Sequence, residues 1–144
     1  MMKTITFSIL AAVLLVQTCR VGAANAEVVV VVSAKSVVGT LTKDQISNIF
    51  LGNSLRFPTG EQAIPIDLAE ETGQFSQFHS VVTGMTVATL RGHWSKMVFS
   101  GRARPPREVS NQNEALKLIA NNPNLIGYID KSLVDTSVKV VFQR

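Results

Sequence analysis

Three polar residues follow a run of five valines near the start of the chain, and their side chains suit an anion. The valines occupy residues 28–32, and Ser33, Lys35 and Ser36 come directly after them. Two hydroxyl groups and an ammonium group can all donate hydrogen bonds to a phosphate-like ligand. Loops at strand ends are the usual ligand sites of α/β sheets. A solvated turn accounts for the same residues equally well, so both interpretations stay open.

A second basic stretch contains Arg102, Arg104 and Arg107, with Pro105 and Pro106 between them. Guanidinium groups hold phosphate and carboxylate groups through paired hydrogen bonds. The three arginines therefore suit an anion site or a surface that docks another protein. A solvated loop is the third interpretation.

No spacing in the sequence marks an enzyme or a metal site. His79 and His93 have none of the usual metal-ligand spacings. The sequence contains no P-loop and no G-x-S-x-G nucleophile elbow, and no spacing identifies a catalytic triad. We therefore expect a protein that is not an enzyme and that uses no cofactor and no metal.

The first 26 residues have the pattern of a secretory signal peptide. Lys3 provides the positive charge, residues 9–16 form an apolar run, and Ala24-Asn25-Ala26 is an A-x-A cleavage site. The apolar run is shorter than the roughly 20 residues that a spanning helix needs. We expect cleavage before Glu27, a periplasmic location, and no transmembrane segment in residues 27–144.

Removal of the leader changes the charge and the cysteine content of the chain. The leader contains Lys3 and Arg20 and no acidic residue, so the net charge falls from +4 to +2. A balance this close to neutral argues against a nucleic-acid partner. The only cysteine, Cys19, also lies in the leader. The remaining 118 residues must therefore fold around an apolar core as one domain, without a disulfide.

Apolar periodicity and turn signals predict strands that alternate with helices. The valine run predicts a strand buried on both faces, and Pro65 indicates an edge or a strand start. Leu90, Trp94, Met97 and Val98 are predicted to face the core from one helix. We expect strands at about 28–32, 63–68, 125–129 and 137–142, and helices at about 42–50, 72–82, 87–99 and from 110 or 111 to about 121. This order predicts an α/β domain with a mixed sheet flanked by helices.

Four segments in this order resemble the periplasmic phosphate-binding proteins, which are the substrate-binding components of phosphate ABC transporters. They are L-T-K-D-Q-I with I-F-L-G at residues 41–52, F-P-T-G at 57–60, H-W followed by F-S-G and P-P at 93–106, and P-N-L-I-G-Y at 123–128. The resemblance covers nearly all of residues 28–142. It implies a fold similar to one lobe of a type 2 periplasmic binding protein, because a two-lobed member is about twice as long.

The resemblance also implies a site. The family's Ser-Gly-Thr phosphate segment, at a helix N-terminus, falls on Thr72, Gly73 and Gln74, and its arginine falls near Asp67. Free N–H groups at a helix N-terminus attract anions, whereas Glu70 and Glu71 beside this segment would repel one. An ordinary helix cap and turn is the other interpretation of Thr72 and Gly73.

Two functions follow from these observations. The first is a periplasmic substrate-binding protein for phosphate or a similar small oxyanion, working with an ABC permease or another inner-membrane protein. The second is a periplasmic interaction or regulatory module that keeps the fold without the ligand, and it is favoured by the missing arginine and the acidic pair Glu70–Glu71.

Overall fold

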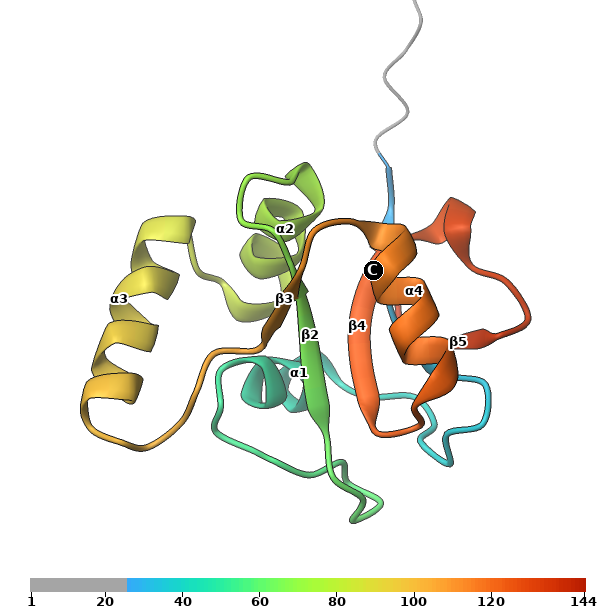
Figure 1. The fold of residues 1–144 in the computed structure, drawn as a ribbon, viewed down its shortest axis with the longest axis horizontal. Helices are drawn as coiled ribbons and strands as arrows, with labels where there is room; N and C mark the ends of the chain where they lie inside the picture. The colour runs from blue at the N-terminus through green and yellow to red at the C-terminus, as the bar shows by residue number, and fades with distance from the viewer. Residues whose placement is uncertain (1–25) are drawn as a thin grey trace, which may run out of the picture.

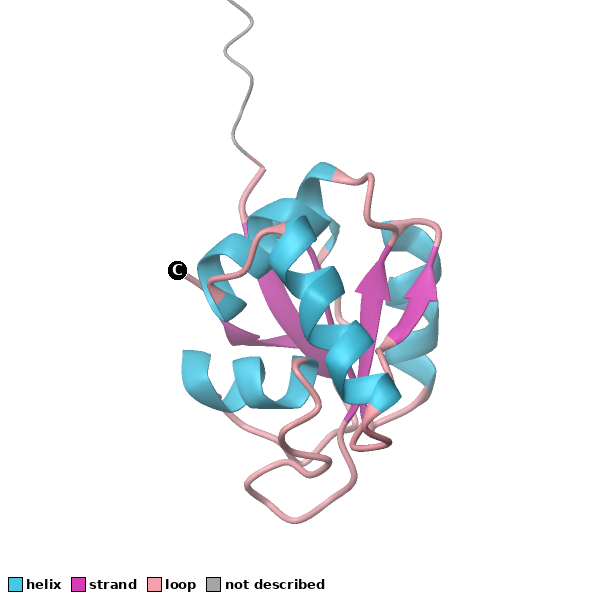
Figure 2. Ribbon diagram, turned by 90° about the vertical axis from the view of Figure 1, so that its left-hand side faces the viewer, coloured by secondary structure: helices cyan, strands magenta, loops and turns pink. Residues whose placement is uncertain are grey.

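The computed structural model describes residues 26–144, and the predicted leader lies outside the described residues except for its last alanine. Five strands form one sheet in the order β3-β2-β4-β1-β5, with helices on both sides (Figures 1 and 2). The strands are β1 (Val28–Ser33), β2 (Ile64–Leu68), β3 (Arg107–Val109), β4 (Leu125–Asp130) and β5 (Val138–Phe142). The helices are α1 (Lys43–Phe50), α2 (Gly73–Phe78), α3 (Val87–Phe99) and α4 (Gln112–Asn121), with a π-helical turn at His79–Thr83 and a 3-10 turn at Lys131–Leu133. The predicted mixed α/β architecture is confirmed.

The valine run forms the strand that the sequence predicts. β1 lies between β4 and β5 and pairs antiparallel with both. Val29 to Val32 are at most 1% exposed. Helix α4 packs on one face of β1 and α2 packs on the other. A strand buried on both faces has no polar alternation, which explains the unbroken apolar run.

Strand β2 is an inner strand of the sheet. It lies between β3 and β4 and is parallel to both. Pro65 sits at the start of the strand, where β4 is paired but β3 has not yet begun, since β3 pairs only from Ile66 onward. A proline that donates no hydrogen bond is tolerated there. The interpretation of Pro65 as a strand start is therefore correct, and that of an edge is wrong.

Strand β3 is an element that the sequence does not predict. It places Arg107 in a strand, although residues 101–107 are expected to form a loop. It has three residues, of which only Val109 is buried. So short a segment has no apolar alternation for a pattern to detect, and only the neighbouring β2 makes it a strand.

Side chains of β4 alternate between two helical layers. A Cβ atom at Gly127 would point at Ile119 of α4, whereas the adjacent Tyr128 packs against Phe50 of α1 and Phe78 of α2. Successive residues of a strand point to opposite faces. Helix α4 therefore covers one face of the sheet, and α1 and α2 cover the other.

Helix α3 lies beside the sheet, next to its β3 edge (Figure 1). Leu90 is its one buried residue, whereas Trp94 and Met97 are half-buried. Val98 is 52% exposed and Phe99 is 96% exposed. The prediction that Val98 faces the core is wrong, because α3 does not lie flat on the sheet and its apolar side borders a groove.

We expect Gly127→Ala to destabilise the domain, because the new Cβ would lie 2.6 Å from Cδ1 of Ile119. Overpacking of this kind costs about 1–3 kcal/mol of unfolding free energy. The Ile119→Val substitution removes Cδ1, so the double variant should lose less stability than the sum of the two single variants. Urea unfolding of all four proteins measures this coupling, and strict additivity would contradict the close contact.

Candidate functional site

A buried carboxylate stands near the carboxyl end of β2. Asp67 is 6% exposed. Its Oδ1 accepts a hydrogen bond from the hydroxyl of Tyr128 on β4. Its Oδ2 lies 3.0 Å from Nε2 of His79, in the π-helical turn that continues α2. Three elements from separate parts of the chain thus meet at one carboxylate, and both of its oxygens have partners.

Both ring nitrogens of His79 face hydrogen-bond acceptors. The Thr83 hydroxyl donates to the His79 carbonyl at 2.8 Å, which leaves its oxygen free to accept from Nδ1 at 3.3 Å. Nε2 faces the Asp67 carboxylate. Nε2 therefore pairs with the Asp67 carboxylate, and Nδ1 pairs with the Thr83 hydroxyl. Such pairing is what allows a charge to be buried in the core.

Tyr128 completes this cluster. Its ring stacks on Phe78 with centroids 4.0 Å apart, and its hydroxyl accepts from the backbone N–H of Leu68 at 3.2 Å while it donates to Asp67. Burial, and then the negative charge of Asp67, raise the pKa of Tyr128 above its ordinary value of 10.0. The phenol therefore acts as a fixed donor.

Sequence reasoning did not assign a role to the Asp67–His79–Tyr128 cluster. One signal was available: Asp67 is a charged residue within the apolar strand sequence I-P-I-D-L. A buried aspartate requires partners. Its partners are 12 and 61 residues away along the chain, so only the fold identifies them.

The predicted phosphate segment follows β2 at the same edge of the sheet, and the Thr72 hydroxyl and Gln74 amide group already have partners. The Thr72 hydroxyl accepts from the N–H of Phe75 at 3.2 Å and donates to the Ala69 carbonyl at 2.8 Å. The Gln74 amide donates to Oδ2 of Asp130 at 3.3 Å. A Cβ at Gly73 would meet no atom within 4 Å. Thr72 thus caps α2, which is one of the two interpretations that the sequence left open.

Asp130 adds a negative charge beside this segment. It ends β4, and its carboxylate also accepts from the Gln112 amide at 3.1 Å. The Gln112 side chain in turn accepts from the Asp130 N–H at 2.6 Å. Glu70 and Glu71 precede Thr72 directly. The helix end that attracts an anion in principle is thus surrounded by carboxylates.

The other predicted anion residues lie elsewhere. Ser33, Lys35 and Ser36 follow the carboxyl end of β1, which runs opposite to β2 and β4 and so places them at the far edge of the sheet from Thr72. Ser33 is fully buried, and its hydroxyl donates to the Ala120 carbonyl at 3.2 Å and accepts from the N–H of Lys35. The Ser36 hydroxyl accepts from the N–H of Val38. The two predicted sites do not converge on one pocket.

The three arginines are exposed. Arg102 and Arg104 lie in the loop that joins α3 to β3, and Arg107 begins β3. The ion pairs found in residues 26–144 involve none of them. The structure leaves them available to solvent or to a partner.

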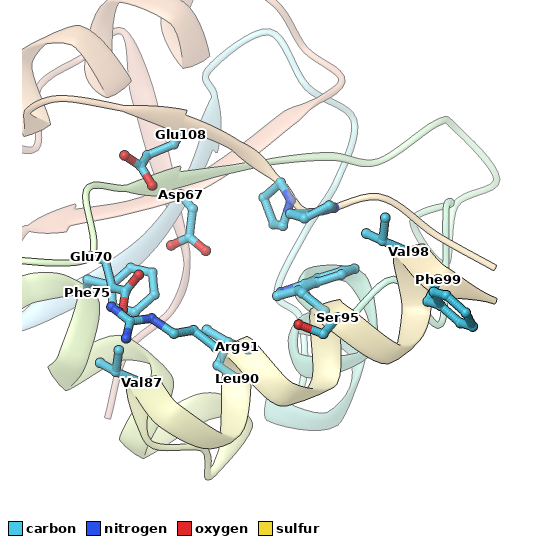
Figure 3. Close-up of a pocket in the computed structure, with 13 residues that line it drawn as sticks. Asp67, Glu70, Phe75, Val87, Leu90, Arg91, Ser95, Val98, Phe99 and Glu108 are labelled. Atoms are coloured by element: carbon cyan, nitrogen blue, oxygen red, sulfur yellow. The ribbon is translucent and has the colours of Figure 1, made fainter. Parts of the chain in front are cut away.

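A groove of about 690 Å³ lies between α3 and strands β2 and β3 (Figure 3). Its walls are mainly apolar and include aromatic rings, and carboxylates gather at one end. The lining residues are Asp67, Glu70, Phe75, Val87, Leu90, Arg91, Trp94, Ser95, Val98, Phe99, Pro105, Pro106 and Glu108. Other cavities of the described domain measure about 320 and 80 Å³.

The position of α3 that creates the groove is fixed at the end of α1. His93 contacts the Leu51 carbonyl through Nε2 at 2.9 Å. Gly52 has a positive φ of 77°, and a Cβ there would lie 2.8 Å from Ala103 and 3.1 Å from the Trp94 ring. Only glycine allows this approach without strain. The Leu51-Gly52 and His93-Trp94 motifs therefore contact each other.

Residues 26–144 contain no helix long and apolar enough to cross a membrane. They also contain no group of three or more histidine, cysteine, aspartate or glutamate residues arranged to hold a metal ion.

Comparison with solved structures shows where this fold occurs. The chain is similar to a protein described as a phosphate ABC transporter substrate-binding protein from Clostridium perfringens with bound phosphate, with a TM-score of 0.65 and 21% identity over 80% of this chain and 44% of that one. It is also similar to an ABC-type phosphate transport receptor from Vibrio cholerae, with a TM-score of 0.63 and 18% identity over 80% of this chain and 45% of that one. A third similar structure is PstS from Borrelia burgdorferi, with a TM-score of 0.59 and 12% identity over 80% of this chain and 46% of that one. No protein-family model and no curated protein match the sequence.

The fold is therefore that of about half of a phosphate ABC transporter substrate-binding protein, as the sequence resemblance implies. The chain spans less than half the length of these structures. The proteins from Clostridium perfringens and Vibrio cholerae are binding proteins rather than enzymes.

Because Tyr128 is the only tyrosine, its ionisation can be followed directly by tyrosinate absorbance. The raised pKa of Tyr128 means that the neutral phenol stabilises the folded state below pH 10, and that this stabilisation is lost as the pH rises above 10. We expect no tyrosinate signal in the native protein until it unfolds. A titration of folded protein with a midpoint near 10 would contradict the buried hydrogen bond.

The matched variant Tyr128→Phe should lower the unfolding free energy at neutral pH by about 1–3 kcal/mol, because it leaves the Asp67 carboxylate without one donor. It should also remove the tyrosine-dependent loss of stability above pH 10. Ser80→Ala, which deletes an exposed hydroxyl, serves as the control and should change little.

Proposed function

We propose that this chain is an exported, non-catalytic binding lobe that serves an ABC permease or another periplasmic protein, and that its binding surface is the groove beside α3 rather than the loop at Thr72–Gln74. The groove carries this proposal, because its volume and apolar walls are those of ligand sites in general, which measure roughly 300–1,000 Å³. The similar solved structures support a binding role.

The residues at Thr72–Gln74 argue against phosphate as the ligand. The Thr72 hydroxyl is used to cap α2, and Gln74 is held by Asp130. Asp67 stands near the position of the family's arginine, so a carboxylate replaces the expected positive charge. A dianion placed here would meet the carboxylates of Glu70, Glu71 and Asp130, and the Arg91 guanidinium beside them is already paired with Glu70.

A phosphate receptor is the second candidate function. It is favoured by the bound phosphate of the Clostridium perfringens structure, whose fold this chain shares over 80% of its length. In this chain, Arg102, Arg104 and Arg107 are exposed groups with the right charge, but Arg102 and Arg104 precede β3 and Arg107 is opposite Ile66. The predicted phosphate segment instead follows the other end of β2. We therefore favour the binding lobe that uses the groove beside α3.

Calorimetric titration of residues 27–144 with inorganic phosphate distinguishes the two functions. We expect no heat of binding and no rise in melting temperature at millimolar phosphate, because carboxylates surround the predicted segment. The Arg102→Gln, Arg104→Gln and Arg107→Gln triple variant is the control for weak surface binding. Saturable binding at micromolar phosphate that survives this triple variant would overturn the groove-binding function and favour a phosphate receptor.

Export is tested by the N-terminus of the mature protein. When the full chain is expressed in a bacterium, we expect the periplasmic fraction to contain protein that begins at Glu27, because cleavage follows Ala26 of the A-x-A site. Ala24→Arg together with Ala26→Arg should block cleavage and leave the leader attached. Intact mass measurement reads both outcomes, and an uncleaved wild-type chain in the cytoplasm would contradict export.

A further inference from the structure

The groove beside α3 has two chemically different ends (Figure 3). The Asp67, Glu70 and Glu108 side chains gather at the end next to β2 and β3, whereas Val98 and Phe99 mark the opposite end. Phe75 lies at the acidic end beside Glu70, and Leu90 and Trp94 also line the groove. A ligand that fits this surface has a polar group at one end and an apolar body.

The charges at the polar end select the sign of that group. Three carboxylates face the groove, and Arg91 is the one lysine or arginine among its lining residues. Arg91 is already paired with Glu70, and its side chain is 72% exposed. Glu108 is exposed, and the ion pairs of residues 26–144 do not include it. The polar end therefore has an excess of negative charge that attracts a cation and repels an anion.

The apolar part of the groove suits the body of such a cation. Trp94 and Phe75 provide aromatic surface, which attracts cations as well as apolar groups. Phe99 is 96% exposed and Val98 is 52% exposed, so apolar area remains uncovered at the outer end. Burial of that area against a ligand would be favourable at about 25 cal/mol per Å².

We propose that this groove binds a small amphipathic organic amine, with its ammonium group at Glu108, where Glu70 and Asp67 add negative charge, and its apolar body along Trp94. This inference rests on the proposed function, which places the binding surface in the groove. The volume of about 690 Å³ holds a small molecule, and the carboxylates supply the charge complementarity. An extended basic peptide is the competing occupant.

Trp94 provides the readout, because it is the only tryptophan of the chain and lines the groove. We choose phenethylamine as the probe, and phenethyl alcohol and hydrocinnamate as its neutral and anionic counterparts. The amine should change the Trp94 fluorescence saturably, the alcohol should bind more weakly, and the anion should bind least. Added salt should weaken amine binding, because the charges at the groove mouth are screened.

Two variants should change the affinity in opposite directions. Glu108→Gln removes a carboxylate and should weaken amine binding by about two- to fivefold, as for a partly exposed ion pair. Arg91→Gln removes the competing cation and should strengthen amine binding by a similar factor of about two to five. Both residues are exposed, so both variants should fold. Glu61→Gln, an exposed acid in another loop, is the matched control and should leave the affinity unchanged.

The outcomes separate this inference from the function on which it rests. Equal binding of amine and alcohol, stronger binding of hydrocinnamate, or no Trp94 response at millimolar amine would overturn the amine assignment. A lysine-containing peptide that binds while phenethylamine does not would overturn it in favour of a peptide. The phosphate titration is independent: tight phosphate binding refutes the proposed function, whereas absence of both phosphate and amine binding refutes only the amine.

Discussion

The hydrogen bonds at the buried Asp67 carboxylate are the constraint on which the rest of this structure depends. Asp67 sits near the end of β2, Tyr128 on β4, and His79 on the turn that follows α2. An unpaired carboxylate in the core would cost several kcal/mol, so the fold is stable only when the three elements meet. The stacking of Tyr128 on Phe78 then fixes the face of the sheet that α2 covers. The same carboxylate borders the groove, so the cluster that holds the fold together also gives the groove part of its charge.

Negative charge gathers at the carboxyl edge of the sheet. Parallel strands β2, β3 and β4 end at this edge, and Asp67, Glu108 and Asp130 lie at or near their ends. A helix N-terminus contributes about half a positive charge, which several nearby carboxylates outweigh. The fold of about half of a phosphate ABC transporter substrate-binding protein is therefore present, with carboxylates at this edge. Fold similarity alone does not determine which ligand such a lobe holds.

The sequence predicted most of the elements, but none of the residues that it marked as a site lines the groove. The valine run and the helix starts near residues 42 and 111 were predicted because each depends on neighbours in the chain: Thr42 and Gln45 form a capping box, and Asn111 caps α4. Strand β3 was missed because its three residues have no pattern of their own. Val98 was assigned to the core because it follows the helical period of Leu90 and Trp94, but periodicity does not reveal whether a helix lies on a sheet or beside it. The roles of Ser33 and Ser36 were open in the sequence, and the structure shows their hydroxyls engaged with nearby backbone groups.

By itself, the sequence determined the leader pattern, the near-neutral charge of residues 27–144, the alternation of strands and helices, and the resemblance to a phosphate-binding lobe. These properties follow from composition and from contacts between near neighbours. Only the tertiary structure decided that Ser33–Ser36 and Thr72–Gln74 lie at opposite edges, since strand direction in a sheet is a long-range property. It also decided that Asp67, Glu70 and Glu108 line one groove with Trp94. The physical reason is that charge and burial act through space, between residues that the chain separates.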